Sequence, residues 1–143
     1  MPENIGLERF LEAQERAYAV ALQEIRNGCK ESHWMWYIFP QIAGLGMSHM
    51  AAYYAIKDLK EASDYLHHPV LGQRLVEISE ALLGLETNDA IEVFGSIDAM
   101  KLRSCMTLFE LVNDRDSPVF RLVLEKFFDG VADDKTIFLT QKR

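Results

Sequence analysis

The chain has few of the features that mark secreted, membrane-spanning or disulfide-bonded proteins. Its 143 residues include only two cysteines, Cys29 and Cys105, so a disulfide framework is not expected and both thiols should be reduced. No apolar stretch approaches the roughly 20 residues that span a bilayer. The amino end also lacks the basic start, apolar run and small-residue cleavage site of a secretory signal. We therefore expect a cytoplasmic protein with no membrane segment.

Positive charge is scarce as well. Lysine and arginine together number 15 against 22 aspartates and glutamates, which gives a formal net charge of −7. An acidic surface of this kind disfavours broad contact with a nucleic acid polymer or an anionic membrane. The composition excludes those partners but leaves room for a local basic pocket.

Recognisable catalytic and metal-binding motifs are missing too. The chain has no glycine-rich phosphate loop and no His-Glu-x-x-His pair. Cys29 or Ser104 could act as a nucleophile with a histidine, but neither chain order nor spacing supports such an arrangement. The four histidines do not follow a known ligand spacing; they are His33, His49, His67 and His68. Neither a metal nor a cofactor is expected.

Strand patterns are absent, and helical spacing dominates instead. Alternation of apolar and polar residues never extends beyond a few positions. Apolar residues recur every three or four positions in five long segments, which cover about residues 5–27, 48–66, 70–84, 97–112 and 118–130. Shorter helices are expected after Ser32 and after residues 87–89. We predict an all-α fold, a single-domain irregular bundle of about seven helices with its core between about residues 5 and 139.

Capping and breaking residues give the expected helix ends. Asn4 and Ser32 are expected caps, because their side chains can accept hydrogen bonds from free backbone amides, and Ser48 should begin the next helical pattern. Pro40 should stop the brief helix that follows Ser32, since the residue before a proline is pushed out of helical geometry. The tail from Asp133 onward fits either a helical turn or an extended segment.

The aromatic residues are concentrated in one short stretch. It reads Ser32-His33-Trp34-Met35-Trp36-Tyr37-Ile38-Phe39-Pro40-Gln41 and holds both tryptophans of the chain. Packing of a core explains some of these rings, but a buried indole needs an acceptor, and His33 and Gln41 would be odd choices for packing alone. We predict that Trp34, Trp36 and Gln41 line a semi-open pocket. Histidine changes protonation near neutral pH, so His33 is the expected catalytic acid or base if a reaction occurs.

The segment of residues 97–112 is apolar around most of a helix, yet it carries four polar side chains. A helix of this kind is usually central, so Lys101, Arg103, Ser104 and Thr107 are candidates for positions that face a cleft. A guanidinium and an ammonium bind carboxylate or phosphate oxygens, and hydroxyls complete the shell. We expect these four residues to hold an anionic group. The simpler alternative for Lys101 is a surface pair with Asp98.

Four further residues are candidate ligand contacts. Gln14 interrupts the apolar stripe of the first helix one turn before Tyr18, and an inward polar pair must find partners or line a cavity. His68 begins a helix whose second turn carries Arg74, and free backbone amides there favour negative charge. A plain helix junction is the alternative for His68.

Three segments resemble a known family, with a likeness that runs from about Leu7 to the tail. They are residues 32–41, residues 68–75 and residues 94–107. The family is one of small proteins catalogued as a domain of unknown function, some members of which carry the automatic label calpastatin. The resemblance implies a mainly helical single domain and no particular activity. The label does not suit the chain, because the inhibitor of that name is a long disordered repeat protein.

Two functional hypotheses follow. In the first, the aromatic segment and the Lys101 helix enclose a pocket for a small anionic, partly planar molecule, such as a nucleotide derivative, with or without turnover. In the second, the chain is an interaction module whose exposed aromatics bind a peptide or a partner helix. The second hypothesis predicts a shallow apolar groove in place of a deep cavity.

Overall fold

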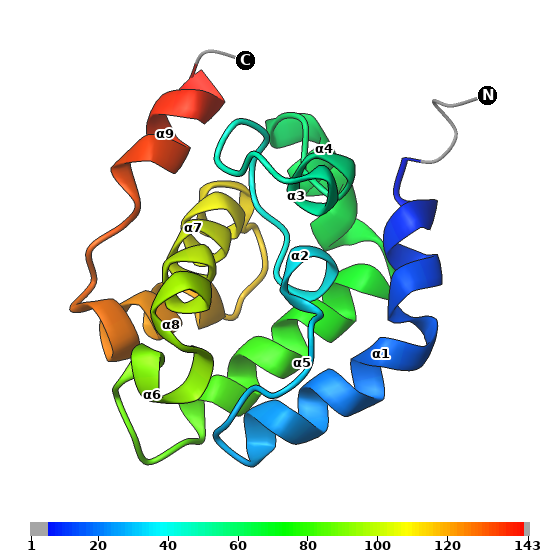
Figure 1. Ribbon diagram of the computed structural model, residues 1–143. Helices are drawn as coiled ribbons and strands as arrows, with labels where there is room; N and C mark the ends of the chain where they lie inside the picture. The colour runs from blue at the N-terminus through cyan, green and yellow to red at the C-terminus, as the bar shows by residue number, and fades with distance from the viewer. Residues whose placement is uncertain (1–5, 142–143) are drawn as a thin grey trace.

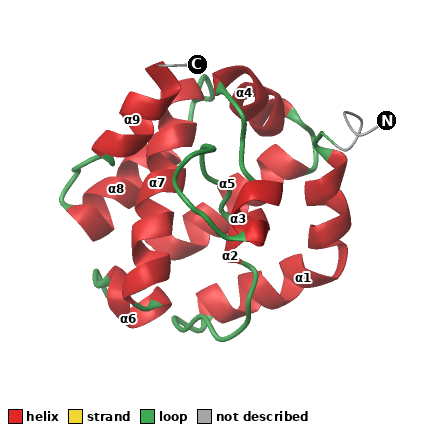
Figure 2. Cartoon of the chain, turned by 45° about the horizontal axis from the view of Figure 1, so that its top comes forward, coloured by secondary structure: helices red, strands yellow, loops and turns green. Residues whose placement is uncertain are grey.

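The computed structural model describes residues 6–141, and over that range its secondary-structure elements are all helices, joined by loops (Figures 1 and 2). Nine helices occur in these residues, of which six have seven residues or more. They are α1 Glu8–Arg26, α2 Met35–Ile38, α3 His49–Tyr53, α4 Leu59–His67, α5 Leu71–Leu83, α6 Ala90–Phe94, α7 Ser96–Val112, α8 Val119–Phe128 and α9 Asp134–Gln141. The predicted all-α single domain is confirmed, and the expected number of about seven helices was slightly low.

Helix α7 lies at the centre of the bundle, as its nearly continuous apolar circumference predicts. It packs against α4, α6, α8 and α9, while α5 joins α1, α4 and α8 from the other side. Leu102, Cys105, Met106 and Phe109 of α7 are all fully buried. The polar residues of this helix must therefore either satisfy one another locally or face neighbouring segments.

Helix ends follow the sequence expectations only in part. A helix begins at Ser48 as expected, and the Ser48 hydroxyl caps α3 by accepting a hydrogen bond from the Ala51 amide. Ser32 does not cap α2, which begins after Trp34 without a side-chain cap. Asn4 lies outside the described residues. The tail is helical, which settles the alternative left open for residues beyond Asp133.

The expected long helix of residues 48–66 is broken in two. Ile56 is fully buried and pairs with Ile42 in an isolated bridge, so the chain is extended between α3 and α4. Asp58 then starts α4 by accepting a hydrogen bond from the Glu61 amide at 2.8 Å. This interruption folds the loop of residues 43–48 back beside α3.

A buried ion pair holds the break in place. Arg9 of α1 and Glu61 of α4 lie 3.4 Å apart, with their side chains 7% and 10% exposed. The Arg9 guanidinium also donates to the carbonyl oxygens of Tyr53 and Ala55, at 2.8 and 2.7 Å. Because those carbonyls lie at the end of α3 and just beyond it, the arginine supplies the hydrogen bonds that a continuous helix would have made.

Two observations bear on the classes of protein considered above. Within residues 6–141, each helix is too short or too polar to cross a bilayer. Over the same range, no three histidine, cysteine, aspartate or glutamate side chains come together in a way that could hold a metal ion.

Candidate functional site

Glu24 of α1 fixes the start of the aromatic segment. Its carboxylate accepts hydrogen bonds from the amides of Glu31 and Ser32, from the Ser32 hydroxyl, and from the Trp34 indole Nε1 at 2.9 Å. Burial alone would raise the pKa of this carboxyl group, but the four hydrogen bonds outweigh burial and lower the pKa of Glu24 from 4.5 to about 2. The indole nitrogen of Trp34, expected to need an acceptor, finds it here.

Each tryptophan lies under a lysine, and the two lysines share one carboxylate. The ammonium of Lys30 is 4.9 Å from the centroid of Trp34, and that of Lys101 is 5.3 Å from the centroid of Trp36. Asp98 pairs with Lys30 at 2.9 Å and with Lys101 at 3.5 Å. The aromatic segment and helix α7 therefore meet, as the first hypothesis requires: a cation–π contact joins Trp36 to α7, and an ion pair joins Lys30, just before the segment, to the same helix.

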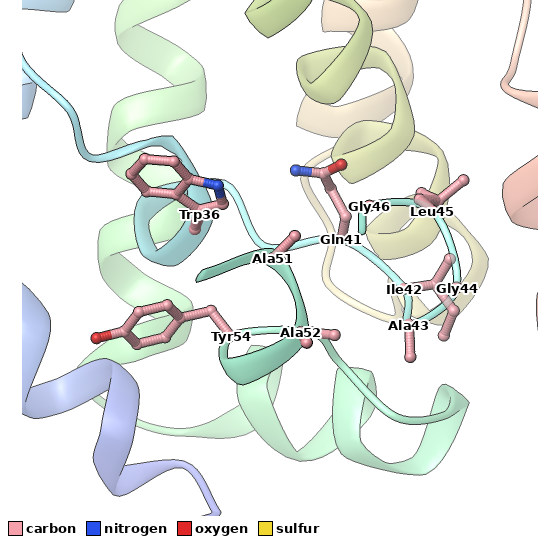
Figure 3. A pocket seen from close by; sticks show the side chains of 11 residues that line it. Trp36, Gln41, Ile42, Ala43, Gly44, Leu45, Gly46, Ala51, Ala52 and Tyr54 are labelled. Carbon is pink, nitrogen blue, oxygen red and sulfur yellow. The ribbon is translucent and has the colours of Figure 1, made fainter. Parts of the chain in front are cut away.

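Beside Trp36 the structure contains a pocket of about 170 Å³ (Figure 3). It lies between α2, the loop that follows, and α3. Its lining residues are Trp36, Gln41, Ile42, Ala43, Gly44, Leu45, Gly46, Ala51, Ala52, Tyr54 and Ala55. Six of these eleven residues are glycine or alanine, which lets a ligand approach the main chain closely.

Glycines are required in this loop. Gly44 has φ 105°, a conformation that other residues rarely adopt. A β-carbon on Gly46 would come within 2.6 Å of the Ala51 β-carbon, so only glycine permits the loop to lie against α3. The shape of the pocket thus depends on two glycines that the sequence marks only as a loop.

Three polar groups around the pocket can form further hydrogen bonds or ion pairs. In the described part of the chain, neither the Trp36 indole nitrogen nor the Gln41 side-chain amide has a recorded hydrogen-bond partner, and Figure 3 shows the Gln41 amide projecting beside the pocket. Lys101 does not line the pocket, but its ammonium lies over the ring that does. A donor, an amide and a cation are therefore available to a ligand.

The other cation of α7, Arg103, is used for structure. Its guanidinium donates to the carbonyl oxygens of Val131 and Ala132, at 2.9 and 3.0 Å. Both acceptors lie in the link between α8 and α9. Arg103 therefore holds that link, and the structure does not bring it to the Trp36 pocket.

Ser104 and Thr107 serve the same link. The Ser104 hydroxyl donates to the Asp133 carboxylate at 3.0 Å, and the Thr107 hydroxyl accepts from the Asp133 amide at 2.9 Å. The same carboxylate accepts from the amide and hydroxyl of Thr136 and so caps α9. Arg103, Ser104, Thr107 and Asp133 together hold the start of α9 against α7.

Gln14 and Tyr18 find partners inside the bundle, away from the pocket. The Gln14 amide donates to the Tyr37 carbonyl at 2.7 Å and to the Tyr65 hydroxyl at 3.0 Å, and it accepts from Arg74. The Tyr18 hydroxyl donates to Glu77 at 2.5 Å. Burial, followed by the neighbouring Glu77 carboxylate, raises the pKa of Tyr18. This network joins α1 to α2, α4 and α5.

His68 and His33 also lie apart from Gln41. The ring of His68 accepts hydrogen bonds from the amides of Val70 and Leu71, so it caps the start of α5. His33 is exposed and lines a different groove, against α1. Of the predicted ligand contacts, the structure brings Trp36, Gln41 and Lys101 together and distributes the others over four further places.

Comparison with known proteins agrees with this fold. A family model described as "Protein of unknown function (DUF1810)" matches residues 4–139. The chain belongs to the DUF1810 family. The crystal structure of the conserved hypothetical protein Rv1873 from Mycobacterium tuberculosis matches with a TM-score of 0.92 and 39% sequence identity, over 96% of this chain and 98% of that one. No curated protein matches, and the label calpastatin is not found in these comparisons.

Sequence reasoning did not identify most of the residues that line the Trp36 pocket of this DUF1810 protein. No residue between 42 and 55 was a candidate, although the Gly44-Leu45-Gly46 stretch followed directly on the aromatic segment. The available signal was Asp58 three residues before Glu61, a helix-start pattern that predicts a break after α3. With that break recognised, the loop and α3 would have been placed next to Trp36.

Proposed function

We propose that the Trp36 pocket of this DUF1810 protein binds a small anionic molecule with one planar ring. The observation that carries the proposal is the Lys101 ammonium, 5.3 Å from the centroid of an indole that lines a pocket. In this arrangement the ring of the ligand lies against Trp36 and the small residues of the wall. Its anionic group takes the ammonium, and the Gln41 amide orients it by hydrogen bonding.

The volume of the pocket limits the size of the ligand. An apolar cavity of about 150 Å³ holds one benzene molecule, whereas pockets for drug-sized ligands measure about 300–1,000 Å³. The Trp36 pocket, at about 170 Å³, therefore suits a single ring with a charged substituent. A nucleotide derivative would place only one of its parts inside.

Lys101 is free to change partners. Its side chain is 27% exposed and its ion pair with Asp98 measures 3.5 Å, whereas Lys30 lies 2.9 Å from the same carboxylate. If Lys101 turns to a ligand, Asp98 keeps its closer lysine and no buried charge is left alone. We therefore expect the exchange of Asp98 for a ligand anion at Lys101 to cost little free energy.

A thermal-shift and NMR titration tests the proposal. Nicotinate, orotate and adenosine monophosphate are the probes, and the indole N–H signal of Trp36 is identified by its loss in Trp36→Phe. We expect at least one probe to raise the melting temperature and to shift that signal. Lys101→Met and Trp36→Ala should abolish both effects.

Lys126→Met is the matched control, because Lys126 also lies over an aromatic ring, 5.4 Å from the centroid of Phe127, but neither residue lines the Trp36 pocket. Binding that survives in Lys101→Met, or that Lys126→Met weakens equally, would contradict the proposal. So would the absence of any response to all three probes at millimolar concentration.

The alternative function is a module that binds a peptide or partner helix through exposed aromatics. Trp34, one of the two rings on which it depends, is only 1% exposed, and Tyr53 at 41% is the more accessible ring on this side. A pull-down that recovers a protein partner from wild type but not from Trp36→Ala would favour this alternative.

A further inference from the structure

A second hollow lies on the opposite edge of the aromatic segment, against α1. It measures about 360 Å³ and shares no lining residue with the Trp36 pocket. One wall is a single face of α1, formed at a spacing of three and four by Ala13, Arg16, Ala17 and Val20. The other wall is residues 32–34 and 37. We call this hollow the α1 groove.

The floor of the α1 groove is apolar and firmly held. Val20 is 47% exposed although it faces the aromatic segment across the groove. Trp34 cannot turn away, because Glu24 accepts its indole N–H and Lys30 covers its ring. A preformed apolar wall of this kind can bind a ligand without the loss of conformational entropy that ordering of the wall would require.

Two side chains that carry or can carry positive charge line the groove without partners. Across residues 6–141, Arg16 has no recorded hydrogen bond or ion pair, and neither has the ring of His33. Arg9, two turns earlier on the same helix, donates to three carbonyls and a carboxylate. Arg16 thus keeps its five donors for a group from outside the described chain.

We propose that the α1 groove binds a small apolar carboxylate. The guanidinium of Arg16 holds the two carboxylate oxygens in a forked contact, and the ring of His33 donates a further hydrogen bond. The apolar body of the ligand covers Ala17, Val20 and the edge of Trp34. One negative charge suits this site better than the two of a phosphate ester, since the chain carries a net charge of −7.

The two tryptophans report on the two sites separately. Phenylacetate is the probe and phenylacetamide its neutral control, and the indole N–H signals of Trp34 and Trp36 are followed by NMR. We expect phenylacetate to shift the Trp34 signal with saturation while phenylacetamide has no effect. A shift confined to Trp36, or equal responses to acid and amide, would overturn the proposal. The result does not depend on whether the Trp36 pocket binds its own ligand.

Variants of exposed residues complete the test. Arg16→Gln should weaken phenylacetate binding by about tenfold or more, because a charge-assisted contact is lost, and His33→Gln by less. Arg26→Gln is the matched control, since Arg26 is an exposed arginine of the same helix that does not line the groove. Unchanged binding in Arg16→Gln would overturn the proposal. So would binding of a peptide with an apolar carboxyl-terminal residue when phenylacetate and hexanoate do not bind.

Discussion

The two tryptophans of this protein have similar lysine and aspartate neighbours, but they differ in burial and in hydrogen bonding. Each ring lies under a lysine ammonium, at 4.9 Å for Trp34 and 5.3 Å for Trp36, and both lysines pair with Asp98. Trp34 is 1% exposed and donates to Glu24, whereas Trp36 is half-buried and borders a pocket. The lysines differ likewise, with side chains 8% and 27% exposed.

This difference separates a structural role from a binding role within one short segment. The Trp34 indole already donates to Glu24, and its lysine is engaged with Ser32 and Asp98, so the Trp34 ring itself offers a ligand only apolar contact. Around Trp36 the indole and the Gln41 amide can still form hydrogen bonds, and a ligand would displace only the loose ion pair of Lys101 with Asp98. Unused polar groups beside a preformed hollow are what a binding site needs.

The largest expected contrast is in stability, between Trp34→Ala and Trp36→Ala. Removing the enclosed ring leaves a cavity and takes away one of the four hydrogen bonds to Glu24, so Trp34→Ala should lower the free energy of unfolding by about 4 kcal/mol. Trp36→Ala should cost about 1 kcal/mol, because part of the ring already contacts solvent. Urea denaturation of both variants measures the difference. Equal losses would show that Trp36 is as structural as Trp34.

Glu24→Gln tests the anchor of the first tryptophan. Replacing a charged acceptor of four hydrogen bonds by a neutral amide should cost about 2 kcal/mol at pH 7. The loss should shrink in acid. The folded pKa of about 2 lies below the ordinary 4.5, so the carboxylate stabilises the fold above pH 4.5 and loses that effect as the pH falls toward 2.

Thermal unfolding of wild type and Glu24→Gln from pH 7 to pH 2 checks this window. The two melting temperatures should converge below pH 4.5, because protonation removes the charge that the substitution already lacks. Glu31→Gln is the control, since the exposed Glu31 side chain has no recorded contact within residues 6–141. A difference that stayed constant down to pH 2 would contradict the assigned role of Glu24.

Sequence reasoning could find the helices because burial of apolar stripes decides them locally. The spacing in residues 97–112 correctly indicated a central helix, and helices were correctly expected to begin at Ser48 and after residues 87–89. The break between α3 and α4 was missed, because it depends on Ile56 pairing with Ile42 and on Arg9 satisfying the carbonyls of the turn. Those partners lie 14 to 46 residues away along the chain.

The site residues could be found by type but not separated by role. Lys101 and Arg103 are two residues apart and equally suited to an anion, yet Arg103 meets the carbonyls of residues 131 and 132 while Lys101 meets Trp36. The local sequence pattern of α7 does not indicate that the α8–α9 link covers one face of this helix. Only the packing of distant segments sorts structural cations from available ones.

A smaller contrast in stability is expected between variants of Lys30 and Lys101. Lys30→Met removes an ammonium that donates to the Ser32 carbonyl at 2.6 Å and pairs closely with Asp98, and it should cost about 1 kcal/mol. Lys101→Met should change the free energy of unfolding by less than about 0.5 kcal/mol, as expected for a loose and partly exposed pair. Chemical denaturation in low salt measures both. A larger loss in Lys101→Met would mean that its ammonium is committed to the fold.

The smallest expected effect on stability, and the sharpest separation of fold from function, belongs to Gln41→Leu. The Gln41 side chain has no hydrogen-bond partner among the described residues, so its replacement should leave the free energy of unfolding within about 0.5 kcal/mol of wild type. The same change should weaken a ring anion in the Trp36 pocket by roughly tenfold, because it removes the group that orients the ligand. Gln73→Leu, at an exposed position of α5, should alter neither quantity. A variant at Gln41 that lost stability without losing affinity would place this residue with Trp34 in the framework and not with Trp36 in the site.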